Sequence, residues 1–344
     1  MVNPIKSYRK TFIILIITLL LIFFVNISLG SVYIPLKQIF LSLFDGQVEK
    51  ESWKSIVLNY RLPKAITAII VGSGLSISGL LMQTLFRNPL AGPFVLGISS
   101  GASLGVAILI LGASYLGANI SSYSFTSWGQ AIAASIGSFL VLSAVMLAAI
   151  KVRNTMSILI IGLMFGSLTA AVISVLAYFS SANQLQQYMF WSFGSLGNLS
   201  WKEISALLIV FIIGILFVVF IIKPLNSLLL GENYAKSMGV NVKRTRNFTL
   251  IATSLLTGVI TAFSGPIAFI GLAVPHLTKL LFSTSNHKTL LPAVAISGSI
   301  IMLICDSIAQ LPNSEYTLPI NAITSLFGAP IIIWLLVRKR KINY

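Results

Sequence analysis

The sequence predicts an all-α polytopic membrane protein with about ten transmembrane helices. Hydrophobic residues make up 56% of the 344 positions, whereas charged residues make up only 9%. Soluble domains usually contain about 25% charged residues, so this chain lacks the charge to cover a soluble surface. Uncharged runs such as 11–30, 204–222 and 290–305 approach or reach the roughly 20 residues with which a helix crosses a bilayer.

Apolar segments that we expect to cross the membrane follow one another along the whole chain. They are residues 12–29, 63–84, 94–113, 128–150, 157–179, 204–222, 248–264, 267–283, 289–309 and 317–336. The first segment follows Lys6, Arg9 and Lys10, which is also the pattern of a secretory signal. Its apolar run is longer than a typical signal core and lacks a small-residue cleavage site, so we expect a permanent first span.

The distribution of basic residues orients these spans. A net charge of +16 would suggest nucleic-acid binding in a soluble protein. With a cytoplasmic N-terminus, however, the basic residues fall on inner segments and inner span ends, except for Lys37, Lys50, Lys54, Arg61, Lys64 and Lys202. This is the positive-inside bias. We expect a multi-pass protein of the bacterial cytoplasmic (inner) membrane, with both termini cytoplasmic, in contact with membrane lipid and without a nucleic-acid partner.

The chain is expected to form one domain. No linker or low-complexity tract divides residues 1–344, so we predict a single transmembrane domain. Its longest outer loop is 31–60 and its longest inner loop is 223–247. Nothing in the sequence matches the phosphate-binding pattern G-x-x-x-x-G-K-[ST], so any ATP must be hydrolysed by a partner.

Reactive side chains are scarce. The single Cys305 excludes an intrachain disulfide and a cysteine cluster, and the two histidines add few metal donors. We expect His276 to make a helix-end hydrogen bond rather than bind metal or relay protons, and His287 to lie in an exposed inner turn. For Asp306, near the outer end of a span, a functional charge and span-to-span hydrogen bonding both remain open. We predict no catalytic residue, no metal site and no cofactor.

A sharp turn at the membrane face is expected at residues 87–93, RNPLAGP, because its prolines stop a helix and its glycine loosens the backbone. The next span opens with LGISSGASLG, in which Gly97, Gly101 and Gly105 recur every four residues. One interpretation is close helix packing along this stripe. The other is a polar, narrow wall beside a conduit, to which Gly97, Ser99 and Gly101 would contribute.

The inner loop contains a short amphipathic stretch between two glycines, LLLGENYAKSMGVNVKRTR, at residues 228–246. Leu229, Leu230, Ala235 and Met238 are available for one apolar side. Such a side suits docking into a groove of a soluble partner. The basic residues that follow it suit a loop at the phospholipid headgroups instead. Composition alone leaves both interpretations open.

Several motifs occur together in an order and spacing that resemble the FecCD-type permeases, which import iron chelates, haem and cobalamin. The matching stretches are RLPK at 61–64, GSGLSISGLLMQ at 72–83, RNPLAGP at 87–93, LGISSGA at 96–102, LGENYAKSMGV at 230–240, GPIAFIGLAVPH at 265–276 and LPINAITSLFGAP at 318–330. They run from the second expected span to the tenth.

The resemblance implies the cobalamin-importer-permease-like fold of type II ABC importers, with ten helices per subunit and an inverted relation between helices 2 to 5 and 7 to 10. It also implies the partners. These are a second permease subunit in a homodimer or heterodimer, two cytoplasmic ABC ATPase subunits, and an extracellular or lipoprotein solute-binding protein.

The resemblance further assigns roles to particular residues. It implies that the ATPase cleft receives a coupling segment containing Leu230, Gly231, Glu232, Ala235, Met238 and Gly239. It places Arg61 and Lys64 where basic residues meet the binding protein, for which snorkelling to the interface is the alternative. It places a cytoplasmic gate at Asn88, Leu90, Thr155 and Met156, for which helix-end capping by Asn88 and Thr155 is the alternative. The sequence departs from the family pattern at two further outer contacts, which are Gln310 and Thr317 here.

The function expected from this resemblance is import of a ferric siderophore across the cytoplasmic membrane, powered by a separate ATPase. Haem and cobalamin are alternative substrates within the family. A secondary transporter driven by an ion gradient is an alternative of a different class, but it would normally bury several ionisable groups near the midplane. A membrane enzyme would need nucleophile, base or metal clusters that the sequence does not offer.

Overall fold

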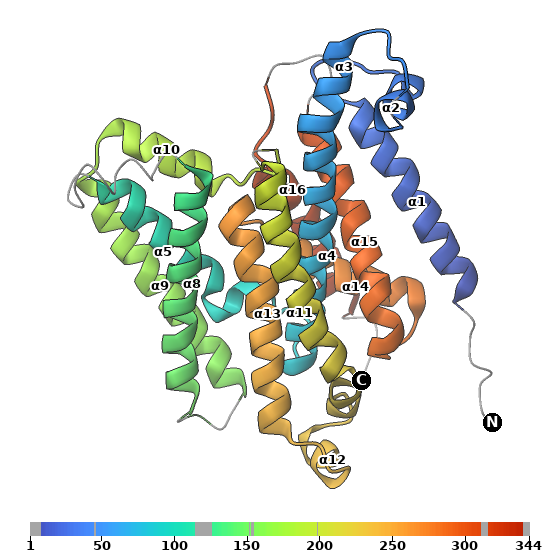
Figure 1. The fold of residues 1–344 in the computed structure, drawn as a ribbon. Coiled ribbons are helices and arrows are strands. Elements are labelled where there is room, and N and C mark those ends of the chain that lie inside the picture. The colour runs from blue at the N-terminus through green and yellow to red at the C-terminus, as the bar shows by residue number, and fades with distance from the viewer. Residues whose placement is uncertain are drawn as a thin grey trace.

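The computed structural model describes residues 8–44, 46–113, 126–150, 152, 155–197, 199–310 and 316–339, and these residues form helices and connecting segments without any strand. A long helix lies at each of the expected spans (Figure 1): α1 (Arg9–Ser28), α4 (Leu62–Leu85), α5 (Ile98–Leu111), α8 (Ser127–Ile150), α9 (Thr155–Tyr178), α11 (Trp201–Leu228), α13 (Val242–Ser264), α14 (Ile270–Phe282), α15 (His287–Ala309) and α16 (Ile320–Lys339). Within the described ranges, 7 helices are long and apolar enough to cross a membrane, and α5, α14 and α16 are shorter apolar helices. The predicted all-α polytopic fold is confirmed.

Short helices cap both ends of this bundle. At one end lie α2 (Leu36–Leu43), α3 (Glu51–Ile56) and α10 (Ala182–Ser192), and at the opposite end α12 (Glu232–Ser237) protrudes beyond the long helices (Figure 1). We call these the α3 end and the α12 end. A π-helical turn, η1 (Val57–Arg61), joins α3 to α4, and a 3-10 turn, η2 (Pro93–Leu96), precedes α5.

Both long loops of the sequence prediction are largely helical. The expected outer loop 31–60 contains α2 and α3, and the chain is helical without interruption from Glu51 to Leu85. The expected inner loop 223–247 is mostly the end of α11, the whole of α12 and the start of α13. Helix α11 has 28 residues, more than the roughly 20 that cross a bilayer, and its last turns lead into α12.

Helix α4 is the centre of the bundle, where it packs against α13, α14 and α15. Glycines permit these contacts. A Cβ atom added at Gly72 would lie 2.3 Å from the carbonyl oxygen of Gly298, and one added at Gly79 would lie 1.7 Å from that of Gly271. Small residues let helix backbones approach closely in lipid, where apolar surface alone gives little driving force for association. The glycine pattern of α4 is therefore a packing pattern.

Two sets of four helices repeat the same contacts. Helix α4 packs against α14 and α15, and α13 packs in the same way against α5 and α8. Likewise α5 contacts α8 and α9, while α14 contacts α15 and α16. Helix α4 runs from the α3 end toward the α12 end, whereas α13 runs in the opposite direction (Figure 1). The set of α4, α5, α8 and α9 is thus related to the set of α13, α14, α15 and α16 by inversion, a common arrangement in transporters.

Candidate functional site

Helix α5 has two different faces, and the glycines lie on the face toward α8. A Cβ atom at Gly101 would lie 2.6 Å from the carbonyl oxygen of Gly137, and one at Gly105 would lie 2.0 Å from that of Ala133. Gly97 precedes the helix with φ 75°, a left-handed conformation that favours glycine, and its Cβ would lie 2.8 Å from the side chain of Val141. The glycine stripe therefore serves helix packing, whereas a path wall that includes Gly97 and Gly101 stays a prediction.

The other face of α5 lines a cavity of about 430 Å³ between α5 and α9. We call it the serine cavity, and its lining consists of Phe94, Ser99, Ser100, Ser103, Gly162, Leu163, Gly166, Ser167 and Ala170. Of these residues, only Ser99 was predicted from the sequence. Ser100 and Ser103 could also have been predicted, because Ser99 and Ser100 lie four and three positions before Ser103 and so share one face of a helix with it. The cavity offers hydroxyl groups and no charged side chain.

The RNPLAGP turn leads from α4 toward this cavity. Arg87 has φ 48°, and the side chain of Asn88 accepts a hydrogen bond of 2.9 Å from the backbone N–H of Leu90. Leu90 is 42% exposed. The ring of His276 donates from Nε2 to the carbonyl oxygen of Pro89 at 2.8 Å, which ties α14 to the turn. The interpretation of His276 as a helix-end hydrogen-bond donor is confirmed.

Two of the predicted gate residues can be placed only by their backbone. Thr155 and Met156 begin α9, and their side chains lie outside the described part of the structure. Asn88 caps its own turn, as the alternative interpretation expected, while Leu90 is the gate candidate whose side chain is free of the protein interior.

The predicted coupling segment is bounded by two glycines in left-handed conformations, Gly231 with φ 110° and Gly239 with φ 80°. The segment exposes three apolar side chains, because Leu230 just before Gly231, Tyr234 within α12 and Met238 at its end are 62%, 53% and 56% exposed. Glu232 is also exposed, but Ala235 is completely buried. Ala235 therefore packs against its own chain, which corrects its predicted place on the docking side. Tyr234 takes that place, and its position four residues before Met238 could have revealed it.

The coupling segment lies next to the RNPLAGP turn. A Cβ atom on Gly231 would lie 3.7 Å from Nη1 of Arg87. These two segments are far apart in the sequence but meet at the α12 end.

At the α3 end, Arg61 is buried rather than presented to a partner, with 9% of its surface exposed. Its guanidinium donates to the carbonyl oxygens of Ile27 at 2.8 Å, Ser28 at 2.9 Å and Val32. These carbonyls belong to the last turn of α1 and the segment after it, where a helix leaves such groups unsatisfied. The structure therefore gives Arg61 a helix-capping role in place of the predicted docking role.

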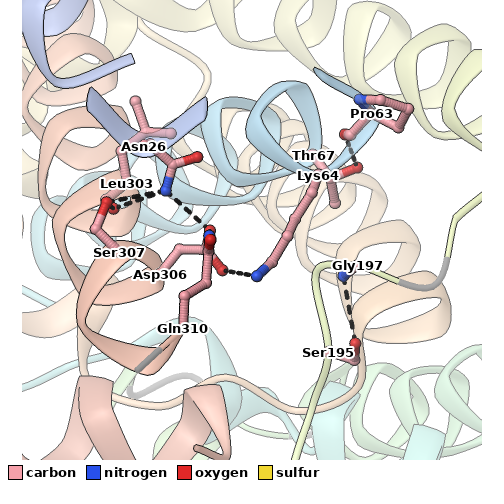
Figure 2. Close-up of polar contacts among 10 residues, drawn as sticks. All are labelled: Asn26, Pro63, Lys64, Thr67, Ser195, Gly197, Leu303, Asp306, Ser307 and Gln310. Carbon is pink, nitrogen blue, oxygen red and sulfur yellow. Dashed lines mark hydrogen bonds and ion pairs between the residues drawn. The ribbon is translucent and has the colours of Figure 1, made fainter. Parts of the chain in front are cut away.

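Lys64 forms an ion pair of 3.1 Å with Asp306, which is itself buried (Figure 2). The carboxylate also accepts hydrogen bonds from Asn26 at 2.9 Å and Gln310 at 2.7 Å. We call these four residues the Asp306 cluster. Because a buried charge is costly unless it is paired and hydrogen-bonded, the cluster accounts for Asp306 within a span. Of the two interpretations left open, hydrogen bonding between spans is confirmed.

The Asp306 cluster borders a second cavity of about 430 Å³ at the α3 end, which also touches the segment around Ser195 and Gly197 and the residues before α16 (Figure 2). Lys64 reaches this cavity, and its side chain is 20% exposed. The amide of Gln310 donates to the Asp306 carboxylate and so helps to hold it. Thr317 lines the same cavity.

The structure also corrects His287, which is 1% exposed and not part of an exposed turn. Its ring bridges two helices, with Nε2 at 2.8 Å from Oγ1 of Thr84 and Nδ1 at 2.8 Å from Oδ1 of Asn226. The polar sequence around it gave no signal for this burial.

Comparison with known proteins places this geometry in a family. The FecCD transport family matches residues 17–338. The hemin transport system permease protein HmuU of Yersinia pestis is 36% identical over 333 residues, which cover 95% of this chain and 96% of that protein. The vitamin B12 import system permease protein BtuC of Salmonella typhi is 35% identical over 286 residues, which cover 83% of this chain and 84% of that protein.

A solved structure agrees with these matches. The inward-facing conformation of a metal-chelate type ABC transporter superimposes with a TM-score of 0.84 at 27% identity, over 96% of this chain and 100% of that chain. The fold class predicted from the sequence is the fold of that transporter. Given matches that span nearly its whole length, the chain belongs to the FecCD transport family, as the membrane-spanning permease subunit of an ABC importer.

Proposed function

We propose that this permease moves a ferric siderophore across the bacterial cytoplasmic membrane, using ATP hydrolysed by a separate ATPase subunit. The observation that carries this proposal is the serine cavity, whose described lining offers hydroxyl groups and small or apolar side chains without a charge. A bare metal cation would need oxygen, nitrogen or sulfur ligands from charged or imidazole side chains. A chelated metal brings its own ligands and needs only a neutral, polar path.

The relatives supply the two alternatives, because HmuU is named for hemin transport and BtuC for vitamin B12 import. Haem iron is usually held by His, Cys, Met or Tyr. None of these types lines the serine cavity among the described residues. This observation favours a metal whose ligand positions are already filled, as in a siderophore complex, and cobalamin is the second candidate for the same reason.

The conformational change driven by ATP hydrolysis would reach the permease at the α12 end, which we place in the cytoplasm. The exposed Leu230, Tyr234 and Met238 form the kind of apolar helical stripe that docks into a groove of a partner. We propose that the groove belongs to the ATPase subunit, with one subunit on each of two permeases. From α12 the movement reaches Arg87 and the RNPLAGP turn, at which Leu90 and the start of α9 close the inner end of the path.

At the α3 end, which we place outside, Lys64 is the one of the two predicted docking residues whose charged group can reach a solute-binding protein. Its ammonium group is partly exposed in the outer cavity, whereas the guanidinium of Arg61 is occupied by backbone carbonyls. An acidic side chain of the binding protein would compete with Asp306 for Lys64. Charge contacts of this kind mainly steer association. The second permease subunit, a copy of this chain or a homologue, would face α9, of which only 17% of an apolar stretch is buried.

The substrate is tested by uptake into a strain that lacks this chain, with labelled ferric siderophore, haem and cobalamin supplied in parallel. Restoration of siderophore uptake by the wild-type gene alone supports the proposal. Restoration of only haem or cobalamin uptake would show that the substrate is not a siderophore, while the assignment as an importer would stand. In proteoliposomes containing the permease, its ATPase and the binding protein, the loaded binding protein should stimulate ATP hydrolysis.

The coupling role is tested by Leu230→Glu, which puts a charge on the exposed apolar stripe. The permease should fold normally, because Leu230 is 62% exposed, but should lose its ATPase in co-purification. The matched control is Ser237→Ala, at the other end of the same segment, whose hydroxyl donates to the carbonyl oxygen of Tyr234 at 2.8 Å. An ATPase that co-purifies equally with both variants would contradict the role assigned to α12.

A further inference from the structure

Three helices meet at a buried histidine near the α12 end. His287 is the first residue of α15, Thr84 lies in the last turn of α4, and Asn226 lies in the last turn of α11. The His287 ring contacts both partners at 2.8 Å, and its backbone N–H also donates to Oδ1 of Asn226 at 2.8 Å. We call these residues, with Asn286, the His287 node.

The orientation of each amide in the node is fixed by a backbone donor. Oδ1 of Asn226 accepts from the backbone N–H of His287, so Nδ2 of Asn226 is the group that donates to Oδ1 of Asn286 at 3.0 Å. Oδ1 of Asn286 in turn accepts from the backbone N–H of Lys288 at 3.0 Å. An amide oxygen has no proton to donate, so the contact between Nδ1 of His287 and Oδ1 of Asn226 requires a proton on Nδ1.

This assignment also determines the other side of the ring. With Nδ1 protonated in a neutral imidazole, Nε2 accepts a hydrogen bond from the hydroxyl group of Thr84. The same hydroxyl lies 2.9 Å from the carbonyl oxygen of Leu80, which is its alternative acceptor. The ring thus joins a hydroxyl donor on α4 to an amide oxygen acceptor on α11.

The position of the node connects it to the coupling segment. Asn226 precedes Gly231 by little more than one helical turn, and α12 begins immediately afterwards. Next to the node, Lys279 of α14 donates to Gln83 of α4 at 3.4 Å, and Gln83 donates to the carbonyl oxygen of Leu272 at 3.2 Å. The end of α4 nearest α12 is therefore linked to α15 and α11 through His287, and to α14 through Gln83.

We infer that His287 is a positioning residue that transmits the displacement of α12 and α11 to α4 and α15 when the ATPase closes. The inference rests on the proposed function as an ATP-driven permease. Chain connectivity alone carries a displacement of α12 into α11 and α13, which flank it in the sequence. The node adds a direct polar link from α11 to the central pair α4 and α15, within a buried environment where a hydrogen-bonded network resists deformation.

The test measures how many ATP molecules are hydrolysed per substrate transported, in proteoliposomes containing the whole complex with its ATPase and binding protein. His287→Ala removes the contacts of the ring with Thr84 and Asn226 but keeps the backbone bond from residue 287 to Asn226, and Thr84→Val removes only the α4 contact at nearly constant shape. Both should raise the ATP cost per transported substrate roughly three- to thirtyfold without lowering ATP hydrolysis, the range expected for residues that carry coupling. The double variant should cost no more than His287→Ala alone.

A conservative variant and a control separate coupling from stability. His287→Asn keeps a donor near the Nδ1 position and should recover part of the coupling. Ser227→Ala changes the exposed neighbour of Asn226, whose hydroxyl bonds to the carbonyl oxygen of Lys223 at 3.4 Å, and should behave like the wild type. If His287→Ala does not assemble, Thr84→Val alone decides the question.

Two outcomes would overturn the inference. One is an unchanged ATP cost per transported substrate in Thr84→Val and His287→Ala. The other is a parallel fall of transport and ATP hydrolysis that follows the amount of folded complex, because this is what a purely structural role gives. Failure of the proposed function has a different signature, since the wild-type complex would then show no ATP hydrolysis stimulated by the binding protein.

Discussion

Helices α4 and α9 are both apolar and long enough to span a membrane, yet they have opposite environments. In the helix that includes α4, 89% of an apolar stretch is buried, against 17% in α9. α4 is fixed to α15 by Lys64 and Asp306 at one end, by Thr84 and His287 at the other, and by glycine contacts between them. Helix α9 packs against α5 and α8, borders the serine cavity and leaves most of its apolar stretch exposed. The comparison separates a closely packed frame from a loosely packed wall.

The strongest test of this comparison replaces one glycine in each helix by alanine. Gly79→Ala should destabilise the permease by about 3 kcal/mol or more, because the new methyl group would overlap the carbonyl oxygen of Gly271 at 1.7 Å. Gly166→Ala in α9 is the matched control, since its methyl group would meet only Oγ of Ser100 at 3.7 Å. It should be neutral or stabilise by up to about 1 kcal/mol. Thermal unfolding of the purified permease measures both.

Equal melting temperatures for the two glycine variants would show that α4 and α9 tolerate volume alike. The division into a closely packed frame and a loosely packed wall would then fail at the contact between Gly79 and Gly271.

A smaller loss is expected from Asp306→Asn, which removes the ion pair at the α3 end of α4. Breaking a fully buried pair costs about 3–5 kcal/mol, and we expect ~1–3 kcal/mol here because the Lys64 side chain is 20% exposed and reaches water. The free energy of unfolding in denaturant measures the change. Replacing both partners, with Lys64→Met and Asp306→Asn, should recover most of it, because the asparagine oxygen still accepts from the buried amides of Asn26 and Gln310. A double variant less stable than Asp306→Asn would argue against the pair as the cause.

The smallest change in stability is expected for Ser99→Leu in the serine cavity, within about 0.5 kcal/mol, because the side chain borders open volume. Its effect on transport should be large, since the leucine narrows a cavity of about 430 Å³ and removes a hydroxyl group. Ser99→Ala removes the hydroxyl group but keeps the room. Uptake by both variants, normalised to the amount of folded protein, distinguishes a steric block from loss of a hydrogen bond, and unchanged uptake by Ser99→Leu would exclude the cavity from the path.

Hydropathy predicted the spans, because the energy that places a helix in lipid depends on local composition. It did not predict which polar residues find one another, since that depends on contacts between distant parts of the chain. Thr84 and His287 are 203 positions apart, and the NHK stretch around His287 has the composition of an exposed turn. The burial of Arg61 was missed for the same reason, because its acceptors are carbonyls of α1 that no side-chain pattern reveals.

Helical spacing held more information about the site than the sequence analysis used. The serines of α5 and the exposed stripe formed by Leu230, Tyr234 and Met238 both recur at intervals of three or four residues. The glycine stripe was equally regular, but a regular pattern does not state which neighbour it faces. Only the position of α8 shows that Gly101 and Gly105 serve packing.

Asn26 has a consequence for how the protein is made. Helix α1 enters the membrane first, and its amide donates to Asp306 and to Oγ of Ser307, which follow 280 and 281 positions later. Until α15 has been synthesised, the first span carries a polar group that lipid cannot satisfy. The hydrogen bonds of this amide to Asp306 and Ser307 can therefore form only after the ninth span has inserted.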